Sequence, residues 1–201
     1  ALGRIAITLA QTLNAQHQSG MDLNGDMGDD FFTLPSPKVI SALSNNPASS
    51  ITAGISDYSA LTTSDYQFSY DGTNYILTRS SDNASVSTAV APTGASPLTL
   101  DGISVTGATS LTNERFRIQP TINGAKDLAV NISDTTKIAA AGPNRTDAAL
   151  TNTGTGKISA GTVNPLPLNS NLQQPLTITF HTPYDGQYDV AGIGAGLPAT
   201  N

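Results

Sequence analysis

The chain has 201 residues and a formal net charge of −6, and only 12% of its residues are charged. This length is enough for one sizeable domain with a core of its own. Because its nine Lys and Arg residues are scattered rather than clustered, we expect no nucleic-acid partner. The absence of cysteine excludes disulfides, thiolate catalysis and zinc sites built on sulfur.

No stretch approaches the ~20 apolar residues that a membrane-spanning helix needs, so we expect no membrane partner. The chain opens inside an amphipathic segment, with neither an initiator Met nor a signal sequence. We therefore expect it to be an internal piece of a longer protein. Abundant Ser, Thr, Asn and Gly are typical of exported β-rich proteins.

The first eighteen residues predict an amphipathic helix, because apolar residues recur with the three- and four-residue spacing of one helical face. Gly20 is expected to end this helix by adopting a left-handed conformation. Since the chain offers no second segment of this kind, we expect the apolar face to pack against parts of a longer protein. The residues on this face are Leu2, Ile5, Ala6, Leu9 and Leu13.

An acidic, glycine-rich stretch follows the helix and raises the question of a calcium site. Asp22, Asn24 and Asp26 have the spacing of the first three ligands of a calcium-binding loop. Met27 stands where that loop requires glycine, and Thr33 stands where it requires a bidentate Glu. We therefore favour a structural turn, and calcium binding by these three residues remains the alternative.

Prolines and asparagines at 35–49 predict a linker, and a hairpin pattern begins beyond it. Asp71-Gly72 is the preferred pair for a two-residue type I′ turn. Such a turn would place Phe68 opposite Tyr75 and Tyr66 opposite Leu77 in the paired strands, with all four side chains on one buried face.

Two further Asp-Gly pairs predict more hairpins. Asp101-Gly102 would place Leu100 opposite Ile103 and Leu98 opposite Val105. The third pair, at 185–186, follows an alternating strand over 176–180. We also expect a strand at 114–119 with Phe116 and Ile118 inward, a strand at 128–132, a strand or helical turn at 138–141, and a loop at 144–161.

These patterns predict a mainly β fold with an N-terminal α-helix, in which an antiparallel, hairpin-built β-domain is attached to the end of the helix. The expected divisions are a helix and turn at 1–34, a linker at 35–49, a β-domain at 50–160, and a further, incomplete hairpin at 161–201.

The sequence offers little that could support catalysis. His17 and His181 lack a second His at metal-ligand spacing, and no G-x-S-x-G motif is present. A hydrolase centred on His181 would need a Ser or Asp within hydrogen-bond reach of its ring. We expect no catalytic, metal or cofactor-binding residues and no cofactor.

Several motifs in order give the chain a family resemblance over residues 1–141. It resembles flagellar hook-associated protein 1, the first hook-filament junction protein. The motifs are Asn14-x-x-His17-x-x-Gly20-x-Asp22-Leu23-x-Gly25-x-x-Gly28-x-x-Phe31-Phe32, Leu61-x-x-Ser64-Asp65-Tyr66, Tyr70-Asp71-Gly72-x-x-Tyr75-x-Leu77-Thr78-Arg79, Phe116-x-Ile118-x-Pro120-Thr121 and Lys137-Ile138-Ala139-Ala140-Ala141.

The resemblance implies a structural, non-enzymatic adaptor that is exported through the flagellar channel and lies outside the cell. Its implied partners are copies of itself in a ring, the hook protein and the second junction protein. It also implies that the helix ends a rod domain, that the acidic stretch is a metal-free turn, and that the β-domain projects outward. Since the terminal helices that polymerise are missing, this piece alone should be monomeric.

A function of a different class is compatible with the same composition. The chain could be a cell-surface adhesin or a carbohydrate-binding β-module, with exposed tyrosines such as Tyr58, Tyr184 or Tyr188 as contact residues. Tyrosines beside a groove would favour this alternative, whereas tyrosines packed within hairpins would not.

Overall fold

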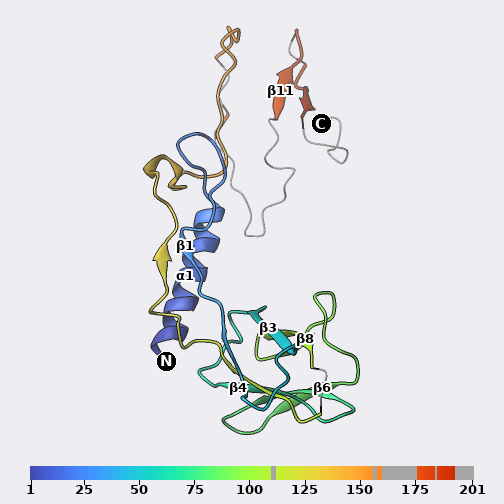
Figure 1. Ribbon diagram of the computed structural model, residues 1–201. Coiled ribbons are helices and arrows are strands. Elements are labelled where there is room, and N and C mark those ends of the chain that lie inside the picture. The colour runs from blue at the N-terminus through green and yellow to red at the C-terminus, as the bar shows by residue number, and fades with distance from the viewer. Residues whose placement is uncertain (110–111, 156–157, 160–175, 184, 193–201) are drawn as a thin grey trace. The chain divides into compact units, whose positions relative to one another are not determined.

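The computed structural model describes residues 1–109, 112–155, 158–159, 176–183 and 185–192 (Figure 1). The chain forms two compact units, Ala1–Ala141 and Gly142–Asn201. This division differs from the expected boundary between 160 and 161. No helix in the described residues is long and apolar enough to cross a membrane.

The first unit combines one α-helix with antiparallel sheets, which confirms the expected fold class. A five-stranded sheet has the order β2-β9-β4-β5-β6, and a three-stranded sheet has the order β3-β8-β7. The bounds in these two sheets are β2 Lys38–Ser41, β3 Ser50–Ile55, β4 Tyr66–Tyr70, β5 Tyr75–Arg79, β6 Ser85–Thr88, β7 Leu98–Leu100, β8 Ile103–Ala108 and β9 Arg115–Gln119.

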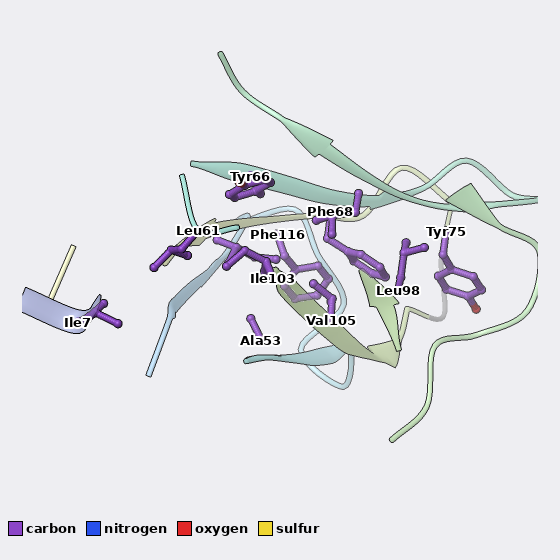
Figure 2. Close-up of a cluster of buried hydrophobic side chains, with 12 residues drawn as sticks. Ile7, Ala53, Leu61, Tyr66, Phe68, Tyr75, Leu98, Ile103, Val105 and Phe116 are labelled. Atoms are coloured by element: carbon purple, nitrogen blue, oxygen red, sulfur yellow. The ribbon is translucent and has the colours of Figure 1, made fainter. Parts of the chain in front are cut away.

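Alternate residues of the two sheets point inward and form one apolar core (Figure 2). In β9, Phe116 and Ile118 are buried whereas Arg115 and Arg117 are exposed, as the alternation in the sequence predicted. The remaining buried members from the sheets are Ala53, Tyr66, Phe68, Tyr75, Leu77, Leu98, Ile103 and Val105.

The hairpin between β4 and β5 forms, but its predicted register is wrong by two residues. Tyr70 pairs with Tyr75, and Phe68 pairs with Leu77. The connection is longer than a two-residue turn because the Asp71 carboxylate accepts hydrogen bonds from the backbone N–H groups of Thr73 and Asn74. The even shift keeps the same side chains on the buried face.

The β7–β8 hairpin has the predicted register, with Leu100 opposite Ile103. Asp101 and Gly102 both have positive φ, as a type I′ turn requires. The Asp101 carboxylate also accepts a hydrogen bond from the Tyr66 hydroxyl at 2.9 Å and pairs with Arg79 at 2.8 Å. This turn therefore links the three-stranded sheet to β4 and β5 of the five-stranded sheet.

Burial, followed by the bond to the Asp101 carboxylate, raises the pKa of Tyr66 to about 12, although the hydrogen bond with Thr62 acts in the opposite direction. Tyr66 is fully buried. The hydroxyl therefore stays protonated and remains a donor throughout the physiological pH range.

The segment expected as a linker at 35–49 contains a strand and a fastened turn. β2 pairs with β9, with Val39 opposite Ile118. The turn that follows this strand is held by Glu114. Its buried carboxylate accepts hydrogen bonds from the Asn46 backbone N–H and the Ser49 hydroxyl. The sequence signal failed because prolines and asparagines flank β2, whose pairing depends on a distant strand.

The helix α1, Leu2–Gln18, has the expected extent. Gly20 does not have a left-handed φ, so the prediction that it ends the helix in a left-handed conformation is wrong. A Cβ at Gly20 would instead overlap the Ala139 carbonyl oxygen.

Beside the helix, strands β1 (Phe32–Thr33) and β10 (Ala129–Val130) form a small antiparallel sheet. Strand β10 is shorter than the strand predicted at 128–132.

A short 3₁₀ helix, Thr135–Lys137, leads into residues 138–141, where neither the expected strand nor a helical turn forms. Only an isolated bridge joins Ala141 to Met21. In the second unit, β11 (Thr177–Phe180) and β12 (Tyr188–Ala191) form an antiparallel hairpin. This is the hairpin predicted at the third Asp-Gly pair. Residues 161–175 and 193–201 lie outside the described part of the chain.

Candidate functional site

One face of α1 presents a continuous row of apolar side chains to solvent. The exposed fractions are 71% for Leu2, 60% for Ile5, 62% for Leu9 and 40% for Leu13. Their spacing places them one above another along a single helical face. We call these four residues the helix stripe. No described segment of the chain covers it, as its exposure shows.

The opposite face of α1 is buried within the first unit, so the expectation that the helix lacks an internal partner is wrong. Asn14 is only 1% exposed, and its side chain makes two hydrogen bonds to the backbone of Phe32. Its amide donates to the Phe32 carbonyl at 2.8 Å, and its Oδ1 accepts from the Phe32 N–H at 2.7 Å. This paired contact holds β1 against the helix.

His17 lies one turn further along the buried face and connects two distant segments. The Ala139 N–H donates to Nε2 at 2.8 Å, so the ring proton resides on Nδ1, which donates to the Asp29 carbonyl at 2.6 Å. Phe31 packs edge-on against the imidazole ring. These contacts give His17 a structural role.

The acidic stretch forms a compact turn in which its aspartates are already engaged. The Asp22 carboxylate accepts hydrogen bonds from the backbone N–H groups of Asn24 and Asp26. The Lys137 ammonium lies 3.3 Å from Asp22 Oδ2 and 3.0 Å from Asp26 Oδ2. A positive charge of the protein therefore occupies the space between two of the three candidate calcium ligands.

The pKa shifts of these groups also favour a structural turn over a calcium site. Burial acts to raise the pKa of Asp22, but the N–H groups of Asp26 and Asn24, together with Lys137, outweigh it and lower that pKa below its ordinary value. Hydrogen bonds to Asp26 and Asp22 raise the pKa of Lys137. Within the described residues, no group of three or more His, Cys, Asp or Glu is arranged to hold a metal ion.

We expect millimolar calcium to leave the thermal unfolding midpoint unchanged, because binding would require the displacement of Lys137 and of the backbone donors. A specific ligand stabilises the folded state in proportion to the logarithm of its concentration. Thermal unfolding followed by circular dichroism with calcium, with magnesium and with a chelator tests this. A midpoint that rises with calcium but not with magnesium would restore the calcium alternative.

Comparison with known proteins shows which protein family contains similar domains and sequences. Residues 1–32 match the model of the flagellar hook-associated protein FlgK helical domain, and residues 40–120 match that of the flagellar hook-associated protein 1, D2-like domain. The chain is 33% identical over 141 residues to flagellar hook-associated protein 1 of Escherichia coli K12, and 34% identical over 148 residues to that of Salmonella typhimurium. The chain belongs to the flagellar hook-associated protein 1 family.

The matched regions are one part of a longer protein in these relatives. The alignments cover 70% and 73% of this chain, which spans about a quarter of the length of the curated hook-associated proteins that it matches. The flagellar hook junction protein FlgK from Burkholderia pseudomallei has the same fold, with a TM-score of 0.68 at 22% identity. That match covers 98% of this chain and 42% of the Burkholderia chain.

His181 lies beyond the residues that the two hook-associated protein models match. Its Nδ1 is 2.9 Å from Asp185 Oδ2, and its Nε2 is 3.5 Å from Asp189 Oδ2. The Asp required by the hydrolase hypothesis is therefore present. Both ring nitrogens face carboxylates, however, and the hydrogen bonds described for the ring involve no serine or threonine. The arrangement fits an ion pair within the connection between β11 and β12.

We expect the β11–β12 hairpin to weaken as pH rises. The hydrogen bond to Asp185, with a further contribution from Asp189, raises the pKa of His181. The stabilisation is thus complete below the unfolded-state pKa of about 6.5 and is lost as pH rises through the higher folded-state value. It is also lost at acidic pH as Asp185, whose pKa is lowered by His181, becomes protonated.

NMR spectra recorded across this pH range test the prediction. The chemical shifts of the His181 ring report its protonation, and the Phe180–Tyr188 ring contact reports whether the hairpin stays formed. In an Asp185→Asn variant, the His181 midpoint should fall towards the ordinary value. An unchanged midpoint in that variant would contradict the ion pair.

The tyrosines proposed as ligand contacts do not form a common surface in the described residues. Tyr58 is half-buried against the core of the first unit. Tyr188 is half-buried and packs edge-on against Phe180 within its own hairpin. Tyr184 lies outside the described residues. Tyr58 and Tyr188 thus pack with their own units, which argues against the adhesin or carbohydrate-binding alternative.

Proposed function

We propose that this chain is the middle part of a flagellar junction protein and acts as a structural adaptor between the hook and the filament. The observation that carries the proposal is the helix stripe on α1, in a chain that belongs to the hook-associated protein 1 family. Four large apolar side chains aligned in water are the expected sign of an interface that another element covers. In this proposal, the covering element is a helix of the same rod domain, contributed by residues outside this chain.

The remaining features fit the same function. The protein would be exported through the flagellar channel and assemble outside the cell as a ring of identical copies. It would contact the hook protein on one side and the second junction protein on the other. The function is mechanical and requires no catalytic residue, metal or cofactor. The described hairpin of the second unit would belong to a further outer domain, completed by residues beyond this chain.

Substitution of Leu9 in the full-length protein tests the proposal. Burying a leucine stabilises an interface by roughly 1.5–3 kcal/mol, so Leu9→Asp should reduce the fraction of hooks that carry a filament. The control is Thr8→Asp, at a neighbouring position off the helix stripe. Because Leu9 is exposed within this chain, the 201-residue variant should keep its circular dichroism spectrum. Normal filaments in the Leu9→Asp strain would contradict the proposal.

A further inference from the structure

Two glycines bring the beginning of α1 against the turn that follows the β-domain, by which we mean the two sheets formed by strands β2 to β9. A Cβ placed on Gly3 would overlap the Thr121 carbonyl oxygen, and a Cβ placed on Gly124 would overlap the Gly3 carbonyl oxygen. The backbone of the helix therefore lies directly against the turn that follows β9. Neither glycine has a left-handed φ, so the close approach, rather than backbone conformation, accounts for the two glycines.

One turn further along the helix, Ile7 packs at the edge of the core of the β-domain. Its side chain is fully buried and belongs to the same cluster as Phe68 and Phe116. Figure 2 shows Ile7 on α1 at the end of the cluster marked by Leu61. The helix thus contributes a residue to the core that the two sheets share.

The far end of α1 is fastened to the chain segments that run to and from the β-domain. Asn14 binds the backbone of Phe32 on the outgoing segment. His17 binds Ala139 on the returning segment. The beginning and the middle of the helix therefore contact the β-domain and the turn that follows it, and the end of the helix is held by the two connecting segments.

We propose that α1 and the β-domain form one rigid body, and that the contact between Gly3 and Gly124 sets the angle between them. This inference rests on the function proposed above and defines its mechanical part. A projecting domain held in this way passes bending and torsion to the rod without a hinge. The angle is fixed because packed backbones have no side chain that can rotate to relieve a load.

Alanine at Gly3 separates this proposal from a simple effect on the helix. Alanine has the highest helix propensity and glycine one of the lowest, so Gly3→Ala should strengthen an isolated helix. The close contact predicts the opposite result for the joint, because the added methyl must push the Thr121 backbone away. The matched control is Gly94→Ala, since a Cβ at Gly94 meets nothing within 4 Å.

Residual dipolar couplings of backbone amides in the 201-residue chain test the rigid joint. In the wild type and in Gly94→Ala, couplings from α1 and from β4 and β9 should fit one alignment tensor. In Gly3→Ala and Gly124→Ala, each element should fit well by itself, but the two should no longer share a tensor. Couplings that remain self-consistent within the β-domain show that a variant is folded.

Two results would contradict the proposed rigid joint. One is a wild-type chain whose helix and β-domain need different tensors, and the other is a pair of glycine variants that both keep one tensor. The wild-type measurement decides whether the joint is rigid even if one of the variants does not fold. Because this experiment involves no flagellum, its failure is distinct from a failure of the proposed function, which the Leu9→Asp strain tests.

Discussion

Replacement of Phe68 by alanine is expected to lower the free energy of unfolding of the β-domain by about 3–5 kcal/mol, the range for truncation of a buried aromatic side chain. Phe68 is fully buried, with its ring centroid 6.0 Å from that of Tyr75 and 6.4 Å from that of Phe116. Both rings belong to strands that pair with β4, so we expect the cavity to stay largely unfilled. Urea unfolding followed by circular dichroism measures the loss.

The neighbouring residue on the same strand provides a matched control. Gln67 points to the exposed face of β4, and Gln67→Ala should change the free energy of unfolding by no more than about 0.5 kcal/mol. Equal effects of the two substitutions would contradict the assignment of faces in β4, on which the description of the core depends.

A second large effect is expected from Asn14→Ala, which should lower the free energy of unfolding by about 2–4 kcal/mol. The substitution leaves the part-buried N–H and carbonyl of Phe32 without their partner. Each unsatisfied group costs about 1–3 kcal/mol when it is buried, and the expected total lies in the lower part of the sum for two groups because water reaches them in part. Alanine has the higher helix propensity, so a loss of stability cannot come from the helix itself. Urea unfolding gives the total effect.

Hydrogen exchange at the Phe32 amide shows whether the loss arises at this contact. Exchange should accelerate in Asn14→Ala and stay unchanged in Gln16→Ala, a substitution of an exposed amide on the same helix. An Asn14→Ala variant with wild-type exchange at Phe32 would mean that this hydrogen-bonded pair does not hold β1 to the helix.

Two of the Asp-Gly pairs show how far local sequence determines a hairpin. At Asp101-Gly102, both residues adopt positive φ, so the preferred turn forms and the register follows from the sequence. At Asp71, the side chain binds the backbone N–H groups of Thr73 and Asn74, which lengthens the connection. Sequence pattern alone does not distinguish these outcomes, because both pairs have alternating apolar strands on either side.

Helix α1 shows the same division between pattern and context. Its solvent-facing row of leucines and isoleucine could be predicted, because apolar periodicity is visible in the sequence. The buried face could not, since two of its four buried residues, Asn14 and His17, are polar and bind backbone groups far along the chain. The resemblance motif containing both residues was the available signal, although it did not reveal their partners.

The role of Asp101 was equally hidden. As a turn residue it was predictable, but its bonds to Tyr66 and Arg79 depend on how the two sheets face each other. The same applies to Glu114, which was expected only as the start of a strand. Its burial against the turn after β2 needs a contact between residues almost seventy positions apart, which hydropathy patterns do not encode.

The most direct test of the central claim is immunogold electron microscopy of the source bacterium with antibodies raised against this chain. The proposed adaptor function predicts discrete label at the boundary between hook and filament. Label along the whole filament would indicate a different axial protein. Label confined to the cell body would contradict a role in the flagellum.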